Sequence, residues 1–357
     1  MSAVRLLDLG LVPSLRSQTV YHAVAHAMLP ETPDTIILIS PLRPYVCIGF
    51  HQDIEREVDR AYCRRAGLPI YRREVGGGAV YLDRDQLFTQ WVFHRSHLPD
   101  SVEERFRLHI RPLVDTYVAF GIAAYHRPLN DIHVEGRKIG GTGAGSLGDA
   151  EVVVGSLMFD FDSGVMAKVL RVGSEKMRDK LHRSLQQYVT SMARELGQAP
   201  DRETVKRVYL EKCGAALGRE IVGGALTERE ELEARRWDAL FVSKGWLHQR
   251  GGLQRKGVKI HEGVRVVEAG HKAPGGLIRV VVRLRDGCID DLALSGDFTL
   301  LPAPGVGALE EAARGLAADP GALLGRFREV YGVMGLRSPG VAPEDFAEAV
   351  LMATNGG

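Results

Sequence analysis

The sequence predicts an α+β protein with two domains, and three observations support that prediction. The chain has 357 residues, more than the roughly 100 to 200 residues of one ordinary domain. Its first part alternates short β-type runs with a helical apolar pattern. Its character changes near Trp246, where a charge-rich helical stretch gives way to a smaller α+β segment. We therefore expect one domain over residues 1–245 and a smaller second domain over residues 246–357.

The first half of the chain contains four predicted strands and one long helix. The strands are expected at residues 35–39, 45–49, 68–73 and 86–93. The helix begins at Ser101, and Glu104 three residues later completes a capping box. Five apolar residues then fall on one helical face: Phe106, Ile110, Leu113, Tyr117 and Phe120. Pro112 removes a backbone donor and is expected to bend or split the helix, and Gly121 is the expected C-cap.

The second half continues with a strand and helices and ends in the smaller segment. A strand is expected at residues 152–159, a helical segment from residue 166, and helices between residues 200 and 237. Residues 277–284 and 289–294 read as the two strands of a hairpin, because Asp286-Gly287 between them is a strong turn signal. Residues 305–331 supply closing helices.

Composition excludes several classes of protein. Lys and Arg number 46 and Asp and Glu 45, so no net field favours nucleic acid or an anionic membrane as the main partner. The four cysteines lack C-x-x-C spacing and indicate neither a zinc site nor a disulfide framework: they are Cys47, Cys63, Cys213 and Cys288. With no apolar run of about 18 residues either, we expect a soluble cytoplasmic protein.

The most informative segment is residues 72–81, which we call the glycine strip. Gly76, Gly77 and Gly78 are consecutive, so their amide N–H groups can approach an anion closely. Arg73 beside them can add bidentate contacts to a phosphate or a carboxylate. A tight connection between two strands is the alternative, and glycine alone does not decide between the two.

A second glycine-rich segment covers residues 130–145. Here Lys138 enters the run Gly140-Gly141-Thr142-Gly143, where its ammonium can stabilise the charge of an acyl phosphate. The alternative is a solvated hairpin over residues 134–139 that turns at Glu135-Gly136. Without the first segment, the hairpin alone would be the preferred interpretation.

Together the two segments resemble the lipoate–protein ligase A family, whose fold is shared with biotin protein ligases and octanoyl transferases. Residues 72–81 match that family's R-R-x-x-G-G-G-A-V-[FY] motif. Residues 130–132 and 136–139 match its N-D-[IL] and G-x-K-[IV] motifs, about 60 residues later. Residues 48–52 resemble its I-G-x-x-Q motif. The resemblance implies a mixed β-sheet flanked by helices over most of residues 1–200, with an accessory domain behind it.

The resemblance also assigns roles to residues. Lys138 aligns with the lysine that touches the lipoate carbonyl and the α-phosphate, and Asp131 with the aspartate that handles Mg²⁺ or orients the incoming amine. Nucleotide contacts are implied for Arg73 and for residues 78–81, whereas Gly76 and Gly77 are implied to form the floor beneath the lipoyl chain. The implied ATP- and lipoyl-adenylate-binding residues are Arg73, Gly76, Gly77, Gly78, Ala79, Val80, Tyr81 and Lys138.

The sequence departs from the family pattern at two places. Leu82 and Asp85-Gln86 stand where the family has a histidine and a Gly-Asn pair, and Gly140-Gly141-Thr142 replaces a serine-containing stretch. These positions bear on the choice of acceptor and acyl chain. Residues 275–298, which include Ser295-Gly296-Asp297-Phe298, resemble the family's accessory domain.

The implied activity is an ATP- and Mg²⁺-dependent lipoate–protein ligase that forms lipoyl-AMP and modifies an acceptor lysine. The implied acceptor is a dehydrogenase E2 subunit, a glycine cleavage H protein or a dedicated lipoate-binding protein, with no nucleic acid and no membrane involved. Two alternatives stay open. One is a lipoyl or octanoyl transferase, which in this fold carries a cysteine downstream of the lysine motif. The other is a non-catalytic lipoate-binding regulatory module.

Overall fold

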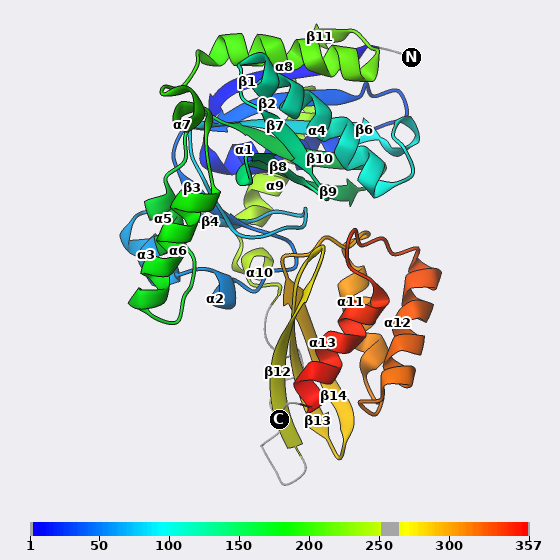
Figure 1. Cartoon of the computed structure of the whole chain (residues 1–357). Helices are drawn as coiled ribbons and strands as arrows, with labels where there is room; N and C mark the ends of the chain where they lie inside the picture. Colours follow the sequence, from blue (N-terminus) through cyan, green and yellow to red (C-terminus); the bar gives the residue numbers. More distant parts are fainter. Residues whose placement is uncertain (1–2, 251–263, 356–357) are drawn as a thin grey trace. The chain divides into compact units, whose positions relative to one another are not determined.

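The computed structural model describes residues 3–250 and 264–355, and the chain divides into two compact units (Figure 1). Unit 1 comprises residues 1–47, 58–71 and 80–246. Unit 2 comprises residues 48–57, 72–79 and 247–357. Two short segments from the first half of the sequence thus group with the C-terminal part. The predicted α+β class is confirmed, since each unit contains its own sheet and helices.

Unit 1 is built on an eight-stranded mixed sheet with the order β11-β1-β2-β6-β10-β9-β8-β7. Strand β1 pairs in parallel with β2 and β11, whereas the remaining neighbours are antiparallel. The strands are β1 (Val4–Val12), β2 (Thr35–Pro41), β6 (Gln86–His94), β7 (Ala124–Arg127), β8 (Asp131–Val134), β9 (Arg137–Leu147), β10 (Ala150–Met158) and β11 (Ile221–Gly223). The strands expected at residues 35–39, 86–93 and 152–159 are confirmed.

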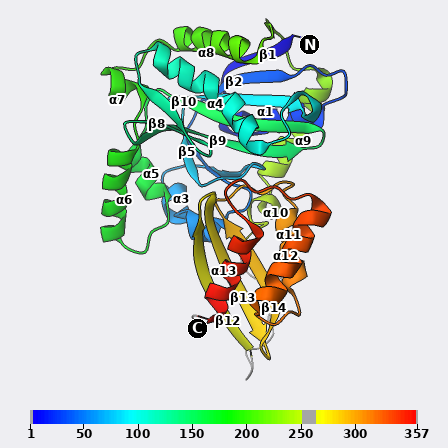
Figure 2. The same ribbon diagram turned by 45° about the vertical axis from the view of Figure 1, so that its right-hand side comes forward.

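Helices cover both faces of this sheet (Figures 1 and 2). On β6, Gln90 donates to the Ser17 carbonyl of α1, while the neighbouring Trp91 donates to the Tyr209 hydroxyl of α8. Successive side chains of a strand point to opposite faces, so α1 and α8 lie on opposite sides. The helices are α1 (Ser14–His26), α3 (Arg60–Arg65), α4 (Val102–Ala119), α5 (Ser163–Val169), α6 (Glu175–Tyr188), α7 (Met192–Leu196), α8 (Arg202–Leu217) and α9 (Glu228–Phe241), with a 3-10 turn at η1 (Arg95–His97).

Helix α4 forms where it was predicted, but its ends differ from the prediction. The capping box is half formed, because among the described residues the Glu104 side chain accepts nothing from the Ser101 amide, and the C-cap is Phe120, one residue before Gly121. The Ser101 hydroxyl accepts from the Glu104 amide at 3.3 Å and caps the helix, and Gly121 adopts φ +82° just beyond its end. Pro112 does not split the helix, which runs unbroken over Val102–Ala119. Its carbonyl instead accepts from the Thr116 hydroxyl at 2.7 Å.

Three short strands form a second sheet of order β4-β3-β5. They are β3 (Tyr45–Ile48), β4 (Ile70–Arg72) and β5 (Val80–Leu82). Strands β3 and β4 were expected at residues 45–49 and 68–73, and both are confirmed in shorter form. Helix α10 (Lys244–Leu247) lies at the boundary between the two units in the sequence.

Unit 2 contains a three-stranded antiparallel sheet with a core of its own. Its elements are α2 (Ile54–Glu57), β12 (Val264–Ala273), β13 (Gly276–Arg285), β14 (Cys288–Gly296), α11 (Gly305–Ala313), α12 (Pro320–Met334) and α13 (Pro343–Asn355). The predicted hairpin is confirmed, and it turns at Asp286 and Gly287 with φ of 52° and 81°. Helix α13 was not predicted. Across the described residues, no helix is long and apolar enough to cross a membrane.

Candidate active site

Lys138 and Asp131 form an ion pair on the hairpin of β8 and β9. The Lys138 Nζ lies 2.7 Å from the Asp131 Oδ1, and the two side chains are 43% and 30% exposed. Both groups are therefore fixed against each other and still accessible to a ligand. The hairpin that the alternative interpretation expected is also present, with Glu135 and Gly136 at positive φ. The hairpin serves to bring the two predicted residues together.

A β-bulge puts Lys138 and Asp131 on the same face of the sheet. Asp131 pairs with Gly141 and His133 pairs with Lys138, and the register shifts between these pairs. Without the shift, Lys138 and Gly141 would face opposite sides, because they are three residues apart on one strand. The extra residue of the bulge thus aligns the lysine with the aspartate.

Gly141 provides the space in which the Lys138 side chain lies. A Cβ atom at this position would be 3.0 Å from the Lys138 Nζ and 3.3 Å from the Asp131 Oδ1. Such contacts would push the ammonium away from the carboxylate. The sequence drew attention to this glycine only as part of a run and did not identify its function.

A second group of residues, which we call the Glu195 clamp, holds the backbone of Lys138. The Lys138 carbonyl accepts from the Thr190 amide at 2.9 Å, and the Thr190 hydroxyl donates to the Glu195 carboxylate. Glu195 also forms an ion pair with Arg137, whose Nη1 lies 3.0 Å from the Glu195 Oε1. Sequence analysis missed the clamp, since Glu195 is 57 residues from Lys138 and no local pattern marks it.

In unit 2, two arginines hold the loops around the triple glycine. The buried Arg72 donates to the carbonyls of Gly49, Phe50 and Gln52 at 3.1, 2.8 and 2.7 Å. Arg73 donates to the carbonyls of Gly76 and Gly78 at 2.8 and 2.9 Å. Arg73 was predicted to contact nucleotide, and in this structure its guanidinium supports the loop.

Two of the three glycines, Gly76 and Gly77, leave little room for a side chain. A Cβ atom on Gly76 would lie 2.6 Å from the Thr299 Oγ1 and 2.9 Å from the Phe298 carbonyl oxygen. Gly77 has φ +93°, a conformation that favours glycine. While Arg73 binds two carbonyls of this loop, the N–H groups of Gly76, Gly77 and Gly78 donate to no acceptor within the described residues. Backbone N–H groups without an acceptor can donate hydrogen bonds to a bound anion.

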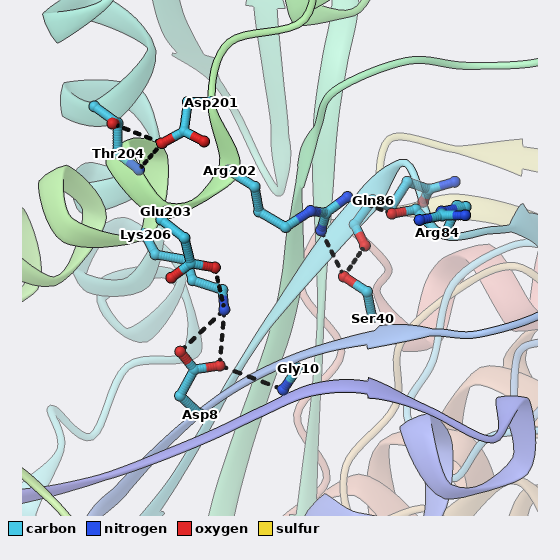
Figure 3. Close-up of polar contacts among 10 residues, drawn as sticks. All are labelled: Asp8, Gly10, Ser40, Arg84, Gln86, Asp201, Arg202, Glu203, Thr204 and Lys206. Carbon is cyan, nitrogen blue, oxygen red and sulfur yellow. Dashed lines mark hydrogen bonds and ion pairs between the residues drawn. The ribbon is translucent and has the colours of Figure 1, made fainter.

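The end of the glycine strip belongs to unit 1. Val80 and Tyr81 lie on β5, and the Tyr81 carbonyl accepts from the Gln86 side chain at 3.2 Å. The Gln86 carbonyl accepts from Ser40 at 2.7 Å, and Ser40 in turn accepts from Arg202 at 2.8 Å (Figure 3). Gln86, one of the departures from the family pattern, therefore links the strip to helix α8.

The first turns of α8 are held by a helix cap and by an ion pair with strand β1. Asp201 caps the helix by accepting from the Thr204 amide at 2.8 Å, and Lys206 contacts both Asp8 and Glu203 at 3.0 Å (Figure 3). These contacts fix Arg202, which also lies 4.5 Å over the Phe159 ring. Tyr81 is therefore linked through Gln86, Ser40 and Arg202 to a helix whose first turn is held by several polar contacts.

The predicted site residues divide between the units. Lys138, Asp131, Val80 and Tyr81 are in unit 1, whereas Arg73, the three glycines and Ala79 are in unit 2. In unit 1, Lys138 and Asp131 are joined by an ion pair, and in unit 2, Arg73 is hydrogen-bonded to the carbonyls of Gly76 and Gly78. Within the parts of the chain that the structure describes, no group of three or more His, Cys, Asp or Glu side chains is placed to hold a metal ion.

Sequence comparison identifies the family. The model described as the lipoyl protein ligase A/B catalytic domain matches residues 17–214. The octanoyltransferase LipM of Kyrpidia tusciae is 28% identical over an alignment of 277 residues that covers 70% of this chain and 100% of that protein. The lipoate-protein ligase A subunit 1 of Thermoplasma acidophilum is also 28% identical and covers 60% of this chain and 83% of that protein. The lipoate-protein ligase LplJ of Bacillus subtilis is 25% identical, covering 72% and 74%.

Solved structures agree on the fold. A chain from the bi-partite lipoate protein ligase of T. acidophilum matches with a TM-score of 0.64 and 25% identity, covering 72% of this chain and 100% of that chain. The structure of P. falciparum LipL1 in complex with lipoate matches with a TM-score of 0.68 over 92% of this chain and 94% of that chain. At 14% identity, the second likeness shows the fold alone.

Proposed function

Because the chain belongs to the family of lipoyl protein ligase A/B catalytic domains, we propose that it is an ATP-dependent lipoate–protein ligase. The family contains both ligases and octanoyltransferases, so the proposal concerns the choice between them. The observation that carries it is the position of the four cysteines. Transfer through a thioester needs an accessible thiolate, and the sequence has no cysteine between Cys63 and Cys213.

The cysteines that flank this gap are poor nucleophiles. Burial raises the pKa of Cys63 to about 11 and that of Cys213 well above its usual range. Cys47 is buried as well, and the exposed Cys288 begins β14 of unit 2. A ligase needs no thiol, because ATP activates the carboxylate directly. The free thiols also support our placement of the reaction in the cytoplasm.

In the proposed first step, a lipoate carboxylate oxygen attacks the α-phosphorus of ATP. A mixed anhydride forms, the α–β phosphate bond breaks and pyrophosphate leaves. The Lys138 ammonium stabilises the negative charge on the carboxylate and the α-phosphate. Asp131 is the carboxylate that would hold Mg²⁺, and the ion would neutralise charge on the outer phosphates of ATP. The unused N–H groups of the triple glycine are the proposed contacts to the adenylate phosphate.

In the second step, the neutral ε-amine of an acceptor lysine attacks the acyl carbon, an amide bond forms and AMP leaves. Lys138 stabilises the carbonyl oxygen, and Asp131 orients the amine and accepts its proton. The candidate acceptors are a dehydrogenase E2 subunit, a glycine cleavage H protein and a dedicated lipoate-binding protein. The T. acidophilum ligase was studied with its E2 lipoyl domain, which supports the first of these.

We further propose that residues 1–245 form the catalytic domain and residues 246–357 an accessory domain that serves activation. The T. acidophilum chain comes from a bi-partite ligase and is matched completely by 72% of this chain. We propose that residues 246–357 correspond to the second part of such a ligase, joined here to the catalytic domain in one polypeptide. That the triple glycine groups with the C-terminal part in unit 2 supports a role in adenylation.

The second candidate is an octanoyltransferase, which the full-length match to LipM favours. One assay separates the candidates. A ligase releases pyrophosphate from ATP only with lipoate present and modifies an apo lipoyl domain, as mass spectrometry shows. A transferase modifies the same domain from an octanoyl thioester without ATP. A non-catalytic lipoate-binding module binds lipoate and does neither.

A further inference from the structure

Helix α6 contributes no buried side chain to the core of unit 1. Leu181 and Leu185 are half-buried on its inner side, and α6 packs beside α5 (Figures 1 and 2). Arg178 provides its main polar anchor. The Arg178 guanidinium donates to the carbonyls of Ala167 and Lys168 at 3.0 Å and lies 3.2 Å from Asp59. The outer side of the helix is left to solvent.

That outer side carries a stripe of three cations, Lys176, Lys180 and Arg183, which we call the basic stripe. Spacings of four and three residues place them in one row. None of the three forms an ion pair with any described residue. Neighbouring like charges at these spacings each cost the helix about 0.2 to 0.5 kcal/mol. An anionic partner would offset this repulsion, because its negative charge attracts all three cations.

The helix as a whole is cationic, with four Lys and Arg side chains against Glu175 and Asp179. Glu175 pairs with the anchoring Arg178 at 3.4 Å, and Asp179, which is at helical spacing from Lys176 and Arg183, offsets only part of the charge of the stripe. Met177 and Tyr188 are 56% and 58% exposed, and both residue types are enriched in protein interfaces. The surface therefore combines positive charge with apolar contacts, as protein partners require.

The same helix ends beside the candidate catalytic lysine. Tyr188 is its last residue, Val189 forms a β-bridge with Lys138, and the Thr190 amide donates to the Lys138 carbonyl. Lys180 is eight residues before Tyr188, or about 12 Å along a helix at 1.5 Å per residue. A domain of about 100 residues has a radius of gyration near 13 Å. One such domain can contact the basic stripe and still reach Lys138.

We propose that the basic stripe of α6 docks an acidic face of the lipoyl-acceptor domain and so directs its target lysine to Lys138. This inference rests on the proposed ligase function and adds to it the surface and charge of partner recognition. Nucleic acid is a poorer fit, because the chain has a formal net charge of +1 and the stripe holds three cations.

The test is a charge reversal in the full-length protein: Lys176→Glu, Lys180→Glu and Arg183→Glu together. The matched control reverses Arg229, Arg235 and Arg236, three exposed arginines on α9, and changes the net charge equally. The acceptor is an apo E2 lipoyl domain. Lipoate-dependent pyrophosphate release without acceptor reports adenylation, and the KM for the acceptor reports docking.

We expect the stripe variant to raise the KM for the acceptor by about tenfold, while adenylation stays within about twofold of the wild type. Salt should raise the wild-type KM and affect the variant less. An unchanged KM, an equal rise in the control, or a loss of adenylation equal to the loss of transfer would overturn the proposal. The proposal would also be overturned if the variant bound phosphatidylserine vesicles or duplex DNA more weakly than the wild type while its KM for the acceptor stayed the same.

The two hypotheses can fail separately. If the wild-type chain releases no pyrophosphate with lipoate, the ligase assignment fails, and titration of the apo lipoyl domain against wild type and both variants still measures docking. Weaker binding in the stripe variant alone would support the docking surface. Equal binding by all three proteins would reject it.

Discussion

The hairpin of Lys138 and the triple glycine differ in the groups that they leave accessible to a ligand. On the hairpin, a bulge and Gly141 leave a lysine 43% exposed and paired with one carboxylate. At the triple glycine, Arg73 is buried and binds carbonyls, and Gly76 approaches Phe298 and Thr299 too closely for any side chain. One segment presents a charged side chain, and the other presents only backbone N–H groups. The glycine run is therefore required for chain packing, and the ligand contact that we propose for it would be made by its backbone N–H groups.

The largest expected effect is at the hairpin. Lys138→Ala removes the ammonium that we assign to the carboxylate and the α-phosphate, so adenylation should fall on the order of a hundredfold to a thousandfold. Lipoate-dependent pyrophosphate release measures the loss, and circular dichroism checks that the variant is folded. Lys180→Ala, a change at an exposed lysine of α6, is the control for adenylation. A folded Lys138→Ala protein with the wild-type rate would remove Lys138 from the mechanism.

The second prediction concerns the triple glycine. Gly77→Val places a Cβ atom 3.0 Å from the Arg73 Nη2 at φ +93°, which blocks the approach of an anion to the loop. We expect calorimetry to show at least about tenfold weaker binding of a non-reactive lipoyl-AMP analogue, because a β-branched side chain is rigid and fills the space beside the donors.

Backbone strain alone needs a separate control. Gly67 also has positive φ, at +65°, and a Cβ atom there would meet nothing within 4 Å. Gly67→Val therefore introduces similar strain, about 1 to 2 kcal/mol, away from the proposed contacts. If both variants bind the analogue as tightly as the wild type does, the triple glycine has a packing role only.

The third prediction separates positioning from chemistry at the hairpin. Glu195→Ala removes the common partner of Arg137 and Thr190, so the backbone beside Lys138 becomes less fixed. We expect kcat for adenylation to fall about tenfold with a smaller change in the KM for lipoate, since misplacement by a fraction of an ångström weakens electrostatic catalysis. Glu195→Gln keeps an acceptor for Thr190 and should restore most of the rate.

A matched control shows whether the loss of any buried ion pair in unit 1 lowers kcat as much as the loss of Glu195 does. Glu151 lies 2.7 Å from Arg105 and is as buried as Glu195. Glu151→Ala should lower the stability of unit 1 and leave kcat of the folded enzyme near the wild-type value. Equal losses of kcat in both variants would mean that the Glu195 clamp is a general structural element and does not position Lys138.

The sequence identified two residues that the structure brings together, but it did not predict how they are brought together. Lys138 and Asp131 stand in one motif, and the structure joins them in an ion pair; the roles that the motif implies for them stay predictions. The register shift that aligns them arises from pairing between strands, which no local pattern encodes. Glu195 is linked to Lys138 only through the tertiary fold. Pro112 does not split α4, because the helix tolerates the loss of one backbone donor when packing holds it in place.

The smallest expected effect is a pH dependence at the unit 1 end of the glycine strip. Asp83 follows β5, and burial raises its pKa to about 6, with Asp85, Asp160 and Asp162 adding repulsion. A carboxyl whose folded pKa is raised contributes most to stability below its unfolded pKa of about 3.9. That contribution is lost as the pH rises through about 6, and above this pH the wild type carries the full cost of the buried charge.

Asp83→Asn removes this cost and keeps an oxygen that can accept from the Asp85 amide, now at 3.0 Å from the carboxylate. We expect the variant to be more stable than the wild type at pH 8 by about 1 to 2 kcal/mol, a value reduced for the partial exposure of the side chain, and nearly equal at pH 4. Urea unfolding followed by tryptophan fluorescence measures the difference in unit 1, since Trp91, Trp237 and Trp246 all lie there. Asp149→Asn, a change at an exposed carboxylate, is the control and measures the effect on stability of removing one negative charge from unit 1. A variant that is less stable at pH 8 would show that the ionised Asp83 is stabilised by its surroundings, and the end of the strip would then be a charged element like the Lys138 hairpin rather than a packed one.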